Sequence, residues 1–166
     1  MRRPLPGIAT AMTILLLACF SLHADEEQKK RFASFEKALD DVTLAGNFTV
    51  VGGDEDAPLT KEEYTITKVE KMEDGDYWKI HARIKYGNQD VTLPLPLEVK
   101  WAGNTPVITL DNVLIPLLGT FSARVVIING KYAGTWTHGK NGGHLFGTIK
   151  KNDEKKTEEK KTEEKK

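Results

Sequence analysis

The clearest alternation of apolar and polar residues lies in residues 119–149, towards the end of the chain. The dipeptide Asn129-Gly130 stands in the middle of this stretch and favours a two-residue type I′ turn, because both central positions of that turn need a positive φ. A turn there places Ala123 opposite Trp136 and gathers the apolar side chains of both strands on one face. The pattern predicts an antiparallel hairpin, which is a scaffold and indicates no chemistry.

A second turn within residues 139–143 returns the chain and adds a third strand. We expect this turn to set His144 opposite His138, with Phe146 opposite Trp136 on the inner face. Two imidazoles across the mouth of a hairpin could share a zinc or copper ion, although a complete site needs a third ligand. The other interpretation is that both histidines are polar residues of a rim.

Earlier parts of the chain contain further short stretches with a period of two. The predicted strands are 46–53, 63–69, 77–85, 91–101 and 106–110, and a proline-interrupted apolar run follows at 112–118. Together with the strands of 119–149, they predict an all-β domain of about eight antiparallel strands. We interpret the run at 112–118 as the lid of the core or as a lip that meets a ligand, a partner or a membrane.

The strand predicted at 91–101 contains two prolines, Pro94 and Pro96. Residues i and i+2 of a strand aim their N–H groups at the same neighbour, so these prolines remove two donors from one side. That side cannot carry a full ladder of hydrogen bonds. The expected fold is therefore an open or imperfect up-and-down barrel, with a two-sheet β-sandwich as the alternative.

Residues 25–44 have the period of an amphipathic helix rather than that of a strand. The apolar stripe of this helix consists of Phe32, Phe35, Leu39 and Val42. It either docks on a partner or closes one end of the β-domain. At the other end of the chain, residues 150–166 repeat Lys and Glu without any apolar residue, so we expect a disordered tail.

Residues 1–24 have the pattern of an export signal peptide. Arg2 and Arg3 precede an apolar run at 8–20, and Ala24 is a small residue that suits the position before a cleavage site. The apolar run is shorter than the roughly 20 residues that span a membrane. We therefore expect cleavage and export rather than a retained anchor.

The segment Leu16-Leu17-Ala18-Cys19 also resembles a bacterial lipobox, in which the cysteine becomes the lipidated first residue. Soluble export and lipidation at Cys19 are both open, and a membrane is an expected partner only in the second case. Cys19 is the single cysteine, so the domain that follows can contain no internal disulfide and no thiolate metal site.

Charge and motifs narrow the possible functions. The chain contains 24 basic and 24 acidic residues, and loss of residues 1–24 leaves a net charge of −2. This near balance gives no argument for nucleic acid as a partner. The sequence has no Gly-x-Ser-x-Gly elbow, no His-Glu-x-x-His motif and no Walker loop. We expect neither an enzyme nor a cofactor.

Inward-facing aromatic residues are the remaining candidates for a binding site. The parity of the strands turns Trp78, Trp101, Tyr132 and Trp136 towards the interior. A cavity lined by these rings would suit a small apolar or ring-shaped ligand. The other interpretation is that they fill the core.

The N-terminal helix, Gly46-Asn47-Phe48 at the start of the sheet and Gly134-Thr135-Trp136 late in the chain resemble the layout of calycins, the class of lipocalin and avidin barrels. The resemblance covers residues 25–149 and implies a small antiparallel barrel. The Gly-x-Trp signature of lipocalins belongs on the first strand, where this chain has Phe48, so no binding residue is carried over. The segments GTFSAR, YAGTW and GGH are also similar to those of small exported bacterial proteins of uncharacterised activity, which implies a recurring domain.

These observations predict an exported, non-catalytic domain of the periplasm, the cell envelope or the extracellular space that binds a small apolar or aromatic ligand. One alternative is a structural or interaction module that contacts an envelope protein. Another is a metal-dependent enzyme that uses His138 and His144. We expect the protein to be a monomer.

Overall fold

The computed structural model describes residues 25–52, 58–86 and 89–152. The chain divides into two units between Ser34 and Phe35, and the second unit contains the β-domain. Cys19, the predicted signal peptide and residues 153–166 of the predicted tail lie outside the described residues. The tail was predicted to begin too early, because Lys150 and Lys151 belong to the last strand and pair with the first one.

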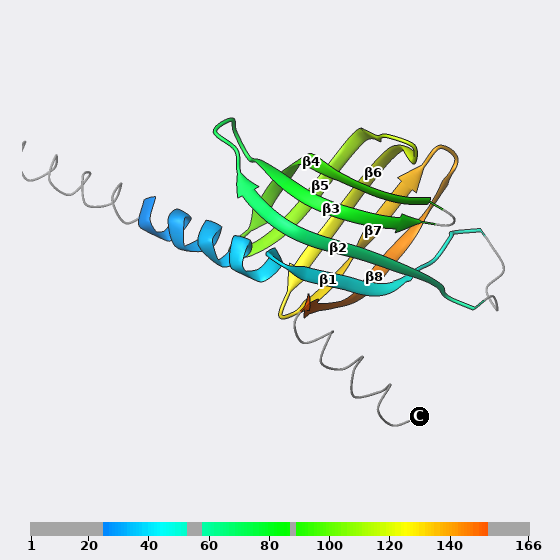
Figure 1. Ribbon diagram of the computed structural model, residues 1–166, viewed down its shortest axis with the longest axis horizontal. Helices are drawn as coiled ribbons and strands as arrows, with labels where there is room; N and C mark the ends of the chain where they lie inside the picture. The colour runs from blue at the N-terminus through cyan, green and yellow to red at the C-terminus, as the bar shows by residue number, and fades with distance from the viewer. Residues whose placement is uncertain (1–24, 53–57, 87–88, 153–166) are drawn as a thin grey trace, which may run out of the picture. The chain divides into compact units, whose positions relative to one another are not determined.

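Eight antiparallel strands form a closed barrel, in which each strand pairs with its neighbours in sequence and β1 pairs with β8 (Figure 1). The strands are β1 (Val42–Phe48), β2 (Thr60–Lys71), β3 (Tyr77–Tyr86), β4 (Gln89–Ala102), β5 (Thr105–Ile115), β6 (Gly119–Ile128), β7 (Lys131–His138) and β8 (Asn141–Lys151). This up-and-down order confirms the predicted barrel and excludes the two-sheet sandwich.

The helix predicted at 25–44 was too long, because the observed helix ends at residue 39. Asp41 has a φ of 51°, in the left-handed region, so the backbone leaves the helical path there. Val42 and Thr43 then begin β1 with both side chains buried. Their β-branched side chains suit a strand better than a helix, which the apolar period alone did not show.

The hairpin of β6 and β7 has the predicted register. Asn129 and Gly130 have φ values of 49° and 69°, as a type I′ turn requires. Ala123 lies opposite Trp136, and the pairing continues along both strands without a bulge. The dipeptide Asn129-Gly130 was therefore sufficient to predict the register of β6 and β7.

The hairpin of β7 and β8 differs from the prediction, because its turn is shorter. His138 pairs with Asn141 and not with His144. A glycine with a φ of 60° opens the turn and lets the chain reverse within two residues. A register shift by an odd number of residues moves every side chain to the other face. His144 and Phe146 consequently lie on the outside, and Leu145 is buried inside.

The ladder between β4 and β5 is the shortest of the barrel, with pairing confined to residues 98–102 of β4. The N–H of Val99 donates to the carbonyl of Asp76 on the β3 side of the strand. N–H positions alternate along a strand, so the positions occupied by Pro94 and Pro96 face β5. The prolines therefore remove N–H donors from the part of β4 that does not pair with β5.

The strand β5 turns away from β4 at the same level. Its pairing with β6 shifts between Leu110 and Val113, and Asn112 in this bulge has a φ of 51°. The bulge and the two prolines leave part of this seam without hydrogen bonds between its strands, although the circle of strands is closed. This agrees with the imperfect barrel that the prolines predicted.

One end of the barrel is packed around Phe35, which lies in the last turns of the helix. Its ring meets Trp78 and Trp101 edge to face, with centroid distances of 4.8 and 5.9 Å. Leu39 and Val99 are completely buried. At these positions the apolar stripe of the helix fills the core of its own domain.

Candidate functional site: an apolar cavity with a buried carboxyl group

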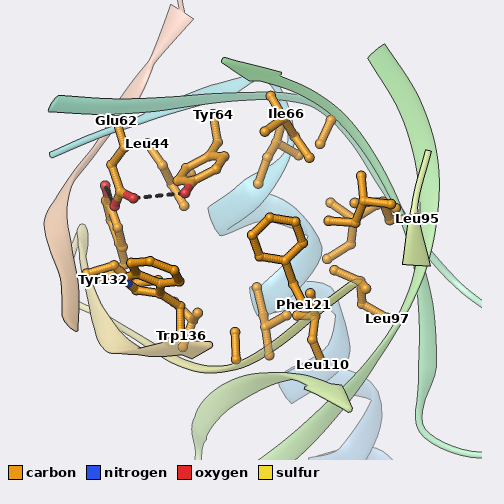
Figure 2. A pocket seen from close by; sticks show the side chains of 18 of the residues that line it. Leu44, Glu62, Tyr64, Ile66, Leu95, Leu97, Leu110, Phe121, Tyr132 and Trp136 are labelled. Carbon is orange, nitrogen blue, oxygen red and sulfur yellow. Dashed lines mark hydrogen bonds between the residues drawn. The ribbon is translucent and has the colours of Figure 1, made fainter. Parts of the chain in front are cut away.

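The interior of the barrel contains a cavity of about 170 Å³ (Figure 2). Its wall consists mainly of aliphatic side chains, among them Ile66, Ile84, Leu95, Leu97 and Leu110. These positions alternate with outward-facing ones along each strand, so the pattern that builds the barrel also makes the cavity apolar. Such a lining favours an apolar ligand.

A carboxyl group interrupts the apolar wall on one side of the cavity (Figure 2). Glu62 of β2 is only 7% exposed and lies beside Tyr64 and Tyr132. The hydroxyl of Tyr64 donates a hydrogen bond to Glu62 Oε2 over 2.8 Å, and the hydroxyl of Tyr132 donates to Oε1 over 2.8 Å. Each carboxyl oxygen therefore accepts one hydrogen bond from the protein.

Two glycines allow Tyr132 to reach Glu62 across the strands that separate them. In the register, Glu62 pairs with Gly46, Gly46 with Gly147, and Gly147 with Tyr132. A Cβ on Gly46 would lie 2.5 Å from the Tyr132 hydroxyl, and a Cβ on Gly147 would lie 2.7 Å from its ring. The missing side chains leave the space that the phenol ring occupies. The hydrogen bond consequently joins β2 to β7 across the two strands that close the barrel.

Burial raises the pKa of Glu62 above its ordinary value of 4.5, because apolar surroundings disfavour the charged form. The hydrogen bonds from Tyr64 and Tyr132 act in the opposite direction, since they stabilise the carboxylate. Burial also raises the pKa of Tyr132, and the neighbouring charge of Glu62 adds to this effect. Tyr132 therefore keeps its proton and its role as a donor at neutral pH.

The four aromatic residues predicted for the ligand site divide into two groups. Tyr132 and Trp136 line the cavity. Trp78 and Trp101 do not line it, because they pack against Phe35 at the closed end of the barrel. The rings of the second group fill the core, which was the other interpretation of these residues.

The indole of Trp136 is fixed in its position by backbone and aromatic contacts. Its Nε1–H donates to the carbonyl of Thr49 over 3.2 Å, and the ring of Phe48 meets it edge to face at 5.6 Å. A ring held from two sides presents a defined surface to the cavity.

The structure places His138 and His144 on opposite faces of the sheet. Nδ1 of His138 lies 2.9 Å from the carbonyl of Thr120, to which it donates, and the imidazole stacks on Phe121 at 4.4 Å. His144 lies outside the barrel, with Nδ1 3.2 Å from the hydroxyl of Thr49. The predicted pairing of the two imidazoles is therefore wrong. No group of three or more His, Cys, Asp and Glu side chains among the described residues is placed to hold a metal ion.

Sequence reasoning missed Glu62 as a site residue. The strand predicted at 63–69 began three residues too late and left out Glu62, although Glu62, Tyr64 and Ile66 have the same parity. Extending the predicted strand towards the N-terminus would have placed Glu62 on the inner face, together with Tyr64 and Ile66. A charged residue normally marks the exposed end of a strand, so Glu62 gave no sign of being buried. The partner that would have shown its burial, Tyr132, is 70 residues away in the sequence.

Comparisons with protein-family models, with curated proteins and with solved structures found no match. The resemblance to calycins and to small exported bacterial proteins stays a prediction. Within the described ranges, no helical segment has the length and apolar character needed to cross a bilayer.

Proposed function

We propose that the barrel is a non-catalytic carrier that binds one small apolar ligand in its interior. The cavity of about 170 Å³ carries this proposal. The apolar side chains around this space lack packing partners on one side, and a ligand that fills the space restores those contacts. A ligand inside an antiparallel barrel is also what the resemblance to lipocalins implies.

The volume of the cavity restricts the ligand to about one ring. An engineered cavity of about 150 Å³ lined by Leu, Ile and Phe binds benzene. The space here is slightly larger, and the rings of Phe121 and Trp136 contribute to its wall. A single aromatic or aliphatic ring with one short substituent therefore fits best.

Thermal unfolding in the presence of toluene tests the carrier function. We expect saturating toluene to raise the Tm of the wild-type protein, because a ligand that binds only the folded state stabilises it. Ala123 lines the cavity, so Ala123→Leu should fill the space and abolish the shift. Ala133 is exposed, and the matched variant Ala133→Leu should keep it.

Two results would contradict the proposal. A wild-type Tm that does not respond to toluene or to other single-ring hydrocarbons would remove the carrier function. An equal shift in the wild type and in Ala123→Leu would place the hydrocarbon outside the cavity.

The pattern of residues 1–24 supports export as the setting of this function. The mass of the protein purified from the cell envelope distinguishes the two forms of export. A chain that begins near Asp25 indicates soluble export, and a chain that begins at Cys19 with added acyl mass indicates a lipoprotein. A chain that begins at Met1 would contradict export by signal cleavage.

Exposed apolar residues favour a second function, an interaction with another envelope protein. Val51, Leu114 and Leu117 are 69%, 69% and 81% exposed, and the strand order places them at the end of the barrel opposite Phe35. Exposed apolar groups at one end of a molecule are typical of contact surfaces. Crosslinking from Leu117→Cys in the native host should then capture one partner that Thr148→Cys does not capture.

A further inference from the structure

The hydrogen-bonding capacity of Glu62 is only partly used within the protein. A carboxylate offers about four lone-pair positions. Tyr64 and Tyr132 occupy one position on each oxygen. Glu62 lines the cavity and is only 7% exposed, so a molecule bound in the cavity is placed to supply further donors.

The two hydroxyls beside Glu62 can accept hydrogen bonds but cannot offer another donor. Each phenol has a single proton, and both protons are directed at the carboxylate. The polar side of the cavity therefore presents acceptor oxygens, while the opposite side presents leucines such as Leu95 and Leu97 (Figure 2). A molecule that matches both sides has an apolar body and a donor at one end.

The carboxylate also lacks a positive partner among the described residues. None of the ion pairs observed among these residues includes Glu62, although the adjacent Glu63 pairs with Lys85. A buried charge is costly unless it is both hydrogen-bonded and paired. Glu62 has its hydrogen bonds but no cation.

We infer that the ligand of the barrel is a small apolar amine, whose ammonium group binds Glu62 and whose hydrocarbon body fills the leucine-lined part of the cavity. This inference rests on the proposed carrier function and defines the chemical class of its ligand. The ammonium group donates up to three hydrogen bonds and supplies the missing charge. A carboxylate ligand is excluded, because it would place a second negative charge beside Glu62 in an apolar space.

A set of probes that differ in one substituent tests the inference. Benzylamine, benzyl alcohol, toluene and benzoate have nearly the same size and differ in charge and donors. We expect benzylamine to bind the wild-type protein about tenfold more tightly than toluene, as one charge-assisted hydrogen bond would produce. Benzyl alcohol should lie between the two, and benzoate should not bind.

The variant Glu62→Gln identifies the group that recognises the amine. It keeps the shape of the side chain and removes its charge, so we expect toluene to bind as before and benzylamine to lose its advantage. The far-ultraviolet circular dichroism of the variant shows whether the barrel has formed. Glu63→Gln is the matched control, since Glu63 is the next residue of β2 and pairs with Lys85 outside the barrel.

The outcomes separate the inference from the proposed function. If toluene binds the wild type as tightly as benzylamine, the amine inference fails and the carrier function stands. This comparison needs no variant, so it decides the question even if Glu62→Gln does not fold. An amine preference that persists in Glu62→Gln would also overturn the inference. If no probe binds the wild type, both the carrier function and the amine inference fail.

Discussion

At the scale of single residues, the contact between Tyr132 and Glu62 depends on what lies between them. The two intervening positions of the register are Gly46 and Gly147, and neither glycine adopts a positive φ. Their role is therefore to leave space rather than to allow an unusual backbone. Small residues beside large ones are a common way to fill the interior of a small barrel.

The variant Gly46→Ala tests this role. The added methyl group would collide with the carbonyl of Phe146 and lie 2.5 Å from the Tyr132 hydroxyl, and the carbonyl belongs to a paired strand that cannot easily move. We expect the free energy of unfolding to fall by about 3 kcal/mol, as overpacking of a core does. Urea denaturation measures this difference.

The control for this measurement is Thr148, an exposed residue of β8 that follows Gly147, the partner of Gly46. Thr148→Ala changes a side chain on the outer face of the same strand as Gly147, and its effect should stay below about 1 kcal/mol. Equal stability of Gly46→Ala and the wild type would show that the barrel can accommodate a side chain at this position.

The raised pKa of Glu62 makes the stability of the protein depend on pH. The folded state holds the proton more tightly than the unfolded state, whose carboxyl titrates near the ordinary value of 4.5. The contribution of Glu62 to the free energy of unfolding is therefore greatest below that pH and is lost as the pH rises through the folded-state pKa. Urea denaturation at several pH values should show this loss in the wild type but not in Glu62→Gln.

The variant Tyr64→Phe independently checks the direction in which the free energy of unfolding changes with pH. It removes a hydrogen bond that lowers the pKa of Glu62, so the pKa should rise further and the decline in stability should extend to higher pH. A decline that moves to lower pH in this variant would contradict the assignment of the effect to Glu62.

At the scale of the elements, the seam between β4 and β5 is the weakest part of the barrel wall. Pro94 and Pro96 supply no N–H groups towards β5, and β5 bends away at its bulge. The backbone of β5 beyond the bulge is held by β6 on one side only. This segment is the part of the wall most suited to open for the proposed ligand.

Hydrogen exchange should show the weakness of this seam directly. We expect the amides of residues 111–115 to exchange at least tenfold faster than those of residues 121–127, because exposed and singly paired strands open more readily. Mass spectrometry of peptides from the two segments measures the difference. Equal protection of both would mean that the seam is as stable as the rest of the wall.

The elements also show where sequence patterns are informative. The β6–β7 hairpin could be predicted because Asn129-Gly130 fixes its turn and its register locally. The β7–β8 hairpin could not, since the glycines of residues 139–143 allow turns of several lengths. The observed two-residue turn places Leu145 inside and brings β8 into register with β1.

At the scale of the whole molecule, the barrel could be predicted but its cavity could not. Alternation along each strand identifies the inner face, and it does not say whether the inner side chains fill the space. Trp78 and Trp136 have the same pattern in the sequence, but one fills the closed end and the other lines the cavity. That difference depends on the position of each ring along the barrel axis and on the helix residue Phe35.

The pairing of β1 with β8 also determines when the protein can fold during its synthesis. The first strand needs the last one as its neighbour, and Tyr132 reaches Glu62 only over Gly46 and Gly147. A nascent chain that ends before β8 exposes two unpaired strand edges, which invite aggregation. Folding is therefore delayed until the final strand has emerged, and contacts so distant in sequence form slowly. Such a delay would suit the proposed export, in which the chain crosses a membrane in an extended form before its barrel closes.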